Sequence, residues 1–301
     1  MKKFLPSLFL ACLLLVLFGC SESPQVAGPS TDMQIPSING KPVVLEQRPE
    51  FVDNRPDELI SAFILSPDVD LLNADKKPPK PPPDTGDGED PNPDPAHKYA
   101  YVVGISDYEG TVNDLQYCDD DARDMKSYYS SQGFTVRMDL DRSATADNIS
   151  AGLDWLIANA SPGDEIVFCY SGHGDKVGQY GSCLISTDLY YVTHGFVMQK
   201  FNQVACSKKL VTIDACKVGS FLSDGEDGSF IALASNNTYS YDAPDLNNGA
   251  WTYYFLEGAD LYIFAEDIVP YAEDGMKAWA KQYHVRVSPC HSDKYTGMLD
   301  I

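Results

Sequence analysis

The pattern of hydrophobic and polar residues after residue 97 alternates between two periods. Short apolar runs, typical of buried strands, lie at 99–104, 134–138, 165–170, 210–213 and 230–235. Between and after these runs, apolar residues recur at helical spacing over 119–132, 145–160, 193–204, 251–256 and 265–282. This alternation predicts an α/β domain in which helices flank a mainly parallel sheet.

Two local patterns refine the prediction. Short runs at 181–186 and 190–192 predict a small hairpin between the third strand and the fourth. Thr145 is expected to cap the helix over 145–160, because a threonine side chain can accept a hydrogen bond from the first helical turn. The segment Ser161-Pro162-Gly163 is expected to end the same helix.

Two reactive side chains follow two of the predicted strands. His173 comes after the third strand, within Tyr-Ser-Gly-His-Gly, and Cys216 comes after the fourth, within Asp-Ala-Cys. The carboxyl ends of parallel strands meet at one edge of a sheet, where ligands bind in such folds. The sequence therefore predicts a histidine base beside a cysteine thiol, which is the equipment for acyl transfer through a thioester.

These motifs and their order resemble the caspase-like cysteine peptidases, most closely the metacaspases and their bacterial relatives. The resemblance extends over most of the domain. It includes the strand and loop at 101–108, the helix start at 118–122, the helix at 144–164, the strand at 209–216 and the late helix at 248–257. It implies a caspase-like sandwich with Cys216 as the nucleophile and His173 as the general base and then acid. It also implies that the backbone N–H groups of Gly174 and Cys216 bind the oxyanion.

The resemblance further implies a first specificity pocket (S1) lined by Asp121 and Asp214. Two carboxylates in one cavity favour a bidentate arginine, or a lysine, before the scissile bond. The alternatives are a helix cap for Asp121 and a hydrogen bond within a loop for Asp214. A preference for acidic residues, as in true caspases, would need basic side chains at these positions.

The sequence departs from the family pattern after the nucleophile. Lys217 and Val218 occupy positions where relatives often carry His-Ser-Gly, and Lys217 either lowers the thiol pKa or points into solvent. This departure supports an alternative interpretation, a catalytically silent binding module with the same fold.

Calcium is the one cofactor that the resemblance suggests, because metacaspases often need it. The segment 178–204 holds only Asp188, and Asp224, Glu226 and Asp227 form an acidic loop after the nucleophile. No required cofactor is therefore evident and calcium stays a candidate. No Cys-x-x-Cys or His-x-x-x-His spacing occurs, so no metal ligands are assigned.

The N-terminus predicts export. Two lysines precede an apolar run over 4–18, and Leu-Phe-Gly-Cys20 resembles a bacterial lipobox, so we expect a signal peptide at 1–19 and a lipid on Cys20. An ordinary signal peptide is the alternative. Ser21 suits the outer membrane or cell surface of a bacterium.

Residues 20–96 predict a largely extended tether with a linker rich in proline and aspartate, ahead of the α/β domain at 97–301. The more apolar part at 33–72 is either a short strand-forming segment that docks on the domain or a pro-segment. Acidic residues outnumber basic ones by 44 to 22, a formal charge of -22, which disfavours nucleic acid as a partner. Expected partners are proteins or peptides with basic residues, and the membrane only through the N-terminal lipid.

Overall fold

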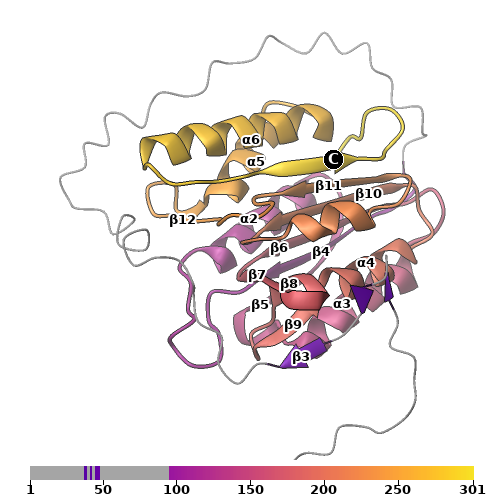
Figure 1. Cartoon of the computed structure of the whole chain (residues 1–301). Coiled ribbons are helices and arrows are strands. Elements are labelled where there is room, and N and C mark those ends of the chain that lie inside the picture. The colour runs from indigo at the N-terminus through magenta and orange to yellow at the C-terminus, as the bar shows by residue number, and fades with distance from the viewer. Residues whose placement is uncertain (1–36, 39–40, 43–44, 48–94) are drawn as a thin grey trace, which may run out of the picture. The chain divides into compact units, whose positions relative to one another are not determined.

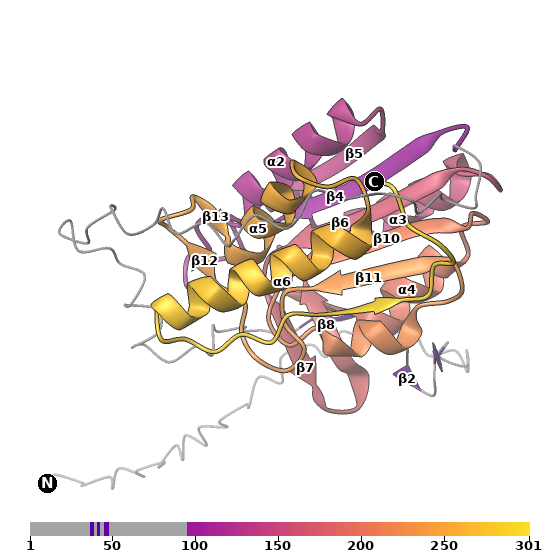
Figure 2. The same cartoon turned by 90° about the horizontal axis from the view of Figure 1, so that it is seen from above.

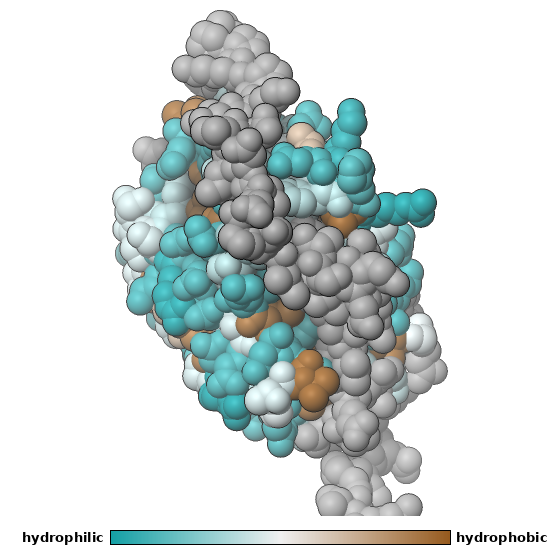
Figure 3. All heavy atoms as spheres, turned by 90° about the vertical axis from the view of Figure 1, so that its left-hand side faces the viewer, coloured by the Kyte–Doolittle hydropathy of each residue, from teal (hydrophilic) through white to brown (hydrophobic). Residues whose placement is uncertain are grey.

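The computed structural model describes residues 37–38, 41–42, 45–47 and 95–301. The predicted signal peptide, Cys20 and most of the predicted tether lie outside these residues. Among the described residues, no helix combines the length and the apolar character needed to cross a membrane. Figure 3 shows a mostly hydrophilic face on which hydrophobic residues form small separate patches.

A six-stranded sheet forms the centre of the domain, in the order β14-β11-β10-β6-β4-β5 (Figure 1). Five strands are parallel, and β14 pairs antiparallel with β11 at one edge. The predicted mainly parallel sheet is therefore confirmed. The strand bounds are Lys98–Gly104 for β4, Thr135–Leu140 for β5, Glu165–Ser171 for β6, Lys208–Asp214 for β10, Ser229–Leu233 for β11 and Cys290–Asp293 for β14.

Helices cover both faces of this sheet, and Figure 2 shows α2, α5 and α6 over one of them. Every residue of β6 is buried, and its side chains alternate between two hydrophobic clusters. Ile166, Phe168 and Tyr170 join the cluster with α3 and α4, whereas Val167 and Cys169 join the cluster with α2, α5 and α6. The helix bounds are Cys118–Ser131 for α2, Ala146–Asn159 for α3, His194–Asn202 for α4, Ala250–Ala259 for α5 and Ala265–Gln282 for α6.

A second sheet has four strands in the order β3-β9-β8-β7, and β7 begins directly after His173. Its strands are β3 (Leu45–Gln47), β7 (Gly174–Val177), β8 (Gly181–Ile185) and β9 (Tyr190–Thr193). The predicted hairpin is β8 and β9, and the pairing of β7 with β8 was not predicted. Because β3 pairs antiparallel with β9, residues 45–47 of the apolar N-terminal segment dock on the domain as a strand.

A local sequence signal also predicted where a helix begins. The Thr145 side chain accepts a hydrogen bond from the Asn148 backbone N–H, so the predicted cap of α3 is confirmed.

Two short strands, β12 (Asp242–Ala243) and β13 (Asn248–Gly249), form a hairpin just before α5. This hairpin was not predicted, and it carries part of the site described next.

Candidate active site

The two central strands bring the predicted dyad together. Asp214, the last residue of β10, lies opposite Ser171, the last residue of β6. His173 and Cys216 each follow two residues later, and both line one pocket at the carboxyl edge of the sheet. The parallel register therefore places the imidazole and the thiol in the same pocket.

His173 is held by the loop that follows β4. The Asn113 carbonyl oxygen lies 2.8 Å from Nε2, and the Tyr108 hydroxyl accepts the backbone N–H of His173 at 2.8 Å. The two rings also pack together, with centroids 4.8 Å apart. Because a carbonyl only accepts hydrogen bonds, Nε2 must donate, so in the neutral imidazole Nδ1 is the proton acceptor.

Cys216 is only half-buried, and its loop lies against the histidine loop. The Ser240 backbone N–H is 3.3 Å from Sγ, a donor that would stabilise negative charge on the sulfur. A Cβ atom on Gly174 would lie 2.4 Å from the Cys216 carbonyl oxygen, far inside van der Waals contact. Glycine at position 174 therefore permits the close approach of the two loops.

The strand register also orients the N–H of Gly174. The Ile185 N–H donates to the His173 carbonyl at 3.1 Å, which is one of the two bonds of a hydrogen-bonded antiparallel pair, and the His173 N–H donates to the Tyr108 hydroxyl instead. Gly174 and Leu184 are the next pair, and such pairs alternate between bonded and non-bonded types. The Gly174 N–H therefore points away from β8, toward the outside of this edge strand.

Asp121, on α2, is fully buried and surrounded by neutral donors. The Ser171 hydroxyl donates to Oδ2 at 2.6 Å, and the Asn248 amide and the Gly249 N–H donate to Oδ1 at 3.1 and 2.8 Å. This carboxylate thus ties α2 to β6 and to the β12–β13 hairpin. It lines a small cavity of about 10 Å³ behind the pocket of the dyad.

Asp214 is 6% exposed and lines both the pocket of the dyad and the cavity behind it. The Thr252 backbone N–H and hydroxyl each donate to Oδ2 at 3.0 Å, and the Ser240 hydroxyl donates to Oδ1. Asp214 and Asp121 face each other across Gly249, where an added Cβ would lie 2.3 and 2.6 Å from their Oδ2 atoms.

Burial controls the protonation of these two carboxyl groups. It raises the pKa of Asp214 to about 6. It raises the pKa of Asp121 well above its usual range, and the nearby charge of Asp214 adds to this effect. Among the described residues, neither carboxylate has a lysine or arginine as a partner. Each accepts only neutral donors, so no cationic side chain neutralises the negative charge that Asp214 carries above its pKa.

A third carboxylate, Asp242, lines the pocket and was missed by the sequence analysis. It lies on β12, directly opposite Gly249 of β13, and its Oδ2 accepts the Gln116 backbone N–H at 2.8 Å. The thiol of Cys118 donates to Oδ1 at 3.7 Å. No periodic or motif signal marks Asp242, because the two-residue strands of its hairpin are too short to produce one.

One expectation for Lys217, that it points into solvent, is wrong. Its Nζ lies 3.1 Å from Asp175, and it lies over the ring of Tyr239 at 5.7 Å from the centroid. The side chain is 26% exposed, so it does not extend freely into solvent. Lys217, which departs from the family pattern, thus forms an ion pair that joins the loop after Cys216 to β7.

The acids that suggested calcium have other partners. Asp188 accepts the Ala146 N–H at 2.9 Å, at the start of α3. The Asp224 carboxylate is buried against Nδ1 of His194. Within the described part of the chain, no group of three histidine, cysteine, aspartate or glutamate side chains is placed to hold a metal ion. Asp188 and Asp224 therefore already use their carboxylates within the protein, and no step is assigned to calcium.

Comparison with known proteins identifies the fold and the family. The family model of the caspase domain matches residues 97–283. Metacaspase-2 of Arabidopsis thaliana is 26% identical over 232 residues, which cover 58% of this chain and 53% of that protein. Metacaspase-4 of Arabidopsis thaliana is 28% identical over 149 residues, which cover 43% of this chain and 35% of that protein.

The chain spans about half or less of the length of these relatives. The crystal structure of protein GSU0716 from Geobacter sulfurreducens has the same fold, with a TM-score of 0.52 at 16% identity over 66% of this chain and 94% of that one. The matched range of the family model covers more than half of the chain and contains both His173 and Cys216. The chain belongs to the caspase domain family of cysteine peptidases.

Proposed function

We propose that this protein is a cysteine endopeptidase that cleaves after arginine or lysine. The observation that carries the proposal is a pair of buried carboxylates with no cationic partner among the described residues. Asp214 lines the pocket of the dyad, and Asp121 lies directly behind it. Family membership supports the peptidase chemistry. The uncompensated negative charge supports the basic substrate residue.

In the proposed reaction, Nδ1 of His173 takes the thiol proton of Cys216 as Sγ attacks the scissile carbonyl carbon. The backbone N–H groups of Gly174 and Cys216 stabilise the oxyanion that forms. His173 then gives its proton to the departing amine, which leaves a thioester on Cys216. Water, deprotonated by His173, attacks this thioester, and the thiol and a carboxylic acid are released.

The setting of the enzyme is also part of the proposal. We place it outside the cytoplasm as a bacterial lipoprotein, anchored through a lipid on Cys20 and separated from the membrane by the 20–96 tether, with outer membrane or cell surface as the site. Its partners are proteins or peptides with basic residues, and nucleic acid is not among them.

We further propose that catalysis needs no metal, since Asp188 and Asp224 already have protein partners.

Replacement of the nucleophile tests the central claim. We expect Cys216→Ala to abolish hydrolysis of a peptide amide with arginine before the cleaved bond. Cys206→Ala is the matched control, because Cys206 is also half-buried but lies before β10, at the opposite end of that strand. Activity that survives in Cys216→Ala at the level of the control would overturn the assignment.

Thiol labelling separates the peptidase from a silent binding module. In an active dyad, Cys216 should react with iodoacetamide at neutral pH much faster than Cys206, and the difference should disappear in His173→Ala. Equal slow labelling of both cysteines would favour the silent module. The same preparation, assayed with calcium and with a chelator, tests whether the reaction is independent of metal.

A further inference from the structure

The two N–H groups that bind the oxyanion in the proposed reaction lie on different segments of the chain. Gly174 begins β7, and Cys216 lies in the loop after β10. Among the described residues, the last backbone hydrogen bond between these segments runs from the Gly172 N–H to the Asp214 carbonyl at 3.2 Å, two residues before the donors. Contacts between side chains therefore have to fix how far apart the two donors lie.

The residues directly after the two donors form an ion pair. Nζ of Lys217 lies 3.1 Å from Oδ1 of Asp175 and 5.7 Å from the centroid of the Tyr239 ring. The side chains of Lys217 and Asp175 are 26% and 11% exposed, so water screens this pair less than it screens a pair on the open surface. Each partner follows its donor by one residue, and the ion pair thus bridges the two segments beside the oxyanion hole.

The backbone of Lys217 is strained as well. Its φ of +55° lies in the left-handed region, which a lysine keeps only where surrounding contacts hold it there. The Lys217 N–H donates to the Thr238 carbonyl at 3.0 Å, and the Ser182 hydroxyl of β8 donates to the Lys217 carbonyl at 2.7 Å. A strained residue directly after the nucleophile, held from two other segments, indicates a constraint on the geometry of the site.

The two segments are already in contact at Gly174. A Cβ atom there would lie 2.4 Å from the Cys216 carbonyl oxygen and 3.1 Å from Cγ1 of Val218. The ion pair holds the segments together one residue further along each of them. Oxyanion donors act only at hydrogen-bond distance, and a misplacement of about 1 Å can lower a rate by about 100-fold. A small relaxation of this contact would therefore be visible in the rate.

We infer that the ion pair between Lys217 and Asp175 fixes the separation of the two N–H donors and so positions the oxyanion hole. Both are positioning residues, because neither of them lines the pocket of the dyad. The inference rests on the proposed acyl transfer at Cys216. It gives a role in catalysis to the residue at which the sequence departs from the family pattern.

Removal of either charge tests this role in the purified chain. We expect Lys217→Gln and Asp175→Asn each to lower kcat for an arginyl amide by about 10- to 100-fold with KM nearly unchanged, because the donors act in the transition state. The double variant should lose no more than either single variant, since both remove the same ion pair. Lys217→Arg should keep most of the parent's kcat, because it keeps the charge.

Lys200→Gln is the matched control. Lys200 also pairs with an aspartate, Asp154, and it also lies over an aromatic ring, that of Phe196, at 5.5 Å from the centroid. Its side chain is 19% exposed, but it lies on α4 and not in either segment of the oxyanion hole. We expect this variant to keep the parent's kcat, which would separate loss of this ion pair from loss of a lysine in general.

Two reactions of the thiol separate the positioning role from an effect on Cys216 itself. Sγ adds to the carbonyl carbon of a peptide aldehyde, and the oxygen of the hemithioacetal lies where the oxyanion forms, so the inhibition constant should rise as kcat falls. In alkylation by iodoacetamide, Sγ displaces iodide and no oxyanion forms, so Lys217→Gln should react at the parent's rate. An alkylation rate that falls as far as kcat would overturn the inference, because Lys217 would then act on the thiol.

Two further results would overturn the inference. One is a Lys217→Gln or Asp175→Asn variant that melts like the parent and keeps the parent's kcat. The other is a double variant whose loss equals the product of the two single losses, because the two side chains would then act independently.

The proposed function fails in a different way, which the parent alone reveals. Citrulline has nearly the shape of arginine without its charge. If the parent hydrolyses an arginyl amide no faster than the matching citrulline amide, cleavage after basic residues is wrong, and either amide still tests the ion pair. A parent that hydrolyses neither amide would overturn the peptidase and, with it, the positioning role.

Discussion

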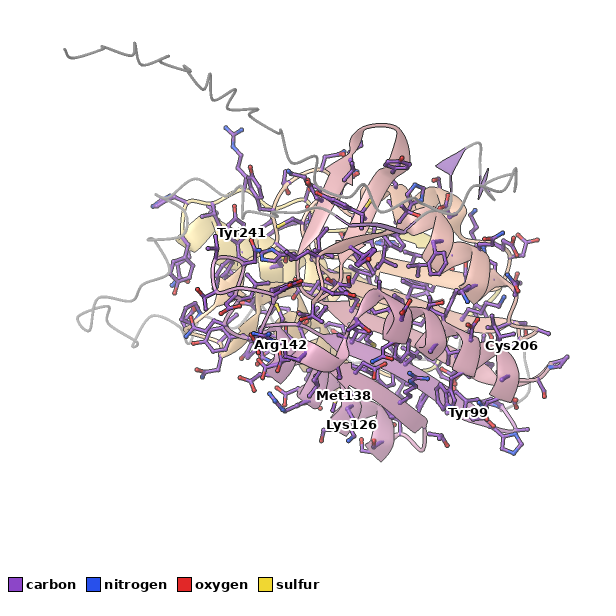
Figure 4. All side chains as sticks on the ribbon, turned by 90° about the horizontal axis from the view of Figure 1, so that it is seen from below. Tyr99, Lys126, Met138, Arg142, Cys206 and Tyr241 are labelled. Atoms are coloured by element: carbon purple, nitrogen blue, oxygen red, sulfur yellow. The ribbon has the colours of Figure 1, made fainter. Side chains whose placement is uncertain are left out.

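The two ends of the central sheet both bury carboxylates, but they neutralise them differently. At the amino end, Lys98 lies 3.1 Å from Glu165, and Lys208 lies 3.0 Å from Asp300. At the carboxyl end, Asp121 and Asp214 accept hydrogen bonds from neutral groups only, among the described residues. Figure 4 shows the two ends on opposite sides of the sheet. Tyr99 and Cys206 lie near the amino end, and Arg142 and Tyr241 lie near the carboxyl end.

This difference separates a structural use of acidic residues from a functional one. A buried carboxylate without a counter-charge is costly, so folding normally supplies a lysine or an arginine, as at the amino end. At the carboxyl end, the chain supplies hydrogen bonds but no cation, and the pocket opens beside the nucleophile. This contrast supports the proposal that the substrate supplies the positive charge.

The largest effect should come from removal of one charge at the carboxyl end. We expect Asp214→Asn to lower kcat/KM for an arginyl amide by about 100-fold, because truncation of a buried charge pair costs several kcal/mol. Glu165→Gln, at the amino end of the neighbouring strand, is the matched control and should change kcat/KM by less than about twofold. Steady-state kinetics of both variants measure the contrast.

Equal losses in the two variants would break the comparison between the ends. A melting curve for each variant is needed, because the side-chain amide introduced by Asp214→Asn would place a donor next to the donors that Asp214 now accepts. The loss attributed to charge is the part that appears with arginine but not with citrulline before the cleaved bond.

A smaller effect should follow from pH. Burial raises the pKa of Asp214 to about 6, so the pocket loses negative charge as the pH falls below that value. Binding of a cation favours the ionised carboxylate, and the ratio of kcat/KM for arginine over citrulline should therefore fall below pH 6, by up to about tenfold per pH unit for one proton. The ratio cancels titration of the dyad itself, which acts on both substrates. A ratio that stays flat from pH 7 to pH 5 would contradict a role for Asp214 charge in selecting the substrate.

The contrast between the two ends also explains which features the sequence could predict. The strands and helices with long apolar patterns were predicted close to their observed ends, and the Thr145 cap was predicted from one side chain. β14 was missed because its four residues, Cys-His-Ser-Asp, alternate only between half-buried and exposed at a sheet edge. The hydrophobic pattern of an edge strand is too weak to identify it.

The site was predicted in part for a related reason. His173 and Cys216 follow strongly apolar strands, so the parallel register alone brings them to one pocket. The partners of Asp121 come from residues 127 and 128 positions away, and no local pattern links them. The ion pair of Lys217 with Asp175 likewise depends on how β7 packs beside the loop after the nucleophile. Such contacts arise from tertiary packing and leave no periodic trace in the chain.

The smallest effect concerns stability at the amino end. Burial raises the pKa of Glu165 to about 7, although Lys98 acts in the opposite direction. The folded state therefore holds this proton more tightly than the unfolded state, whose pKa is near the ordinary value of 4.5. The contribution of Glu165 to stability is complete below pH 4.5 and is lost as the pH rises toward 7, with a slope of up to about 1.4 kcal/mol per pH unit. We expect Glu165→Gln to reduce the fall in stability between pH 5 and pH 7 by up to this amount, measured by urea unfolding, while other carboxyl groups with raised pKa values, such as Asp214, keep their share of the slope. An unchanged slope would mean that Lys98 keeps Glu165 ionised throughout, and the amino end would then differ from the pocket in protonation as well as in pairing.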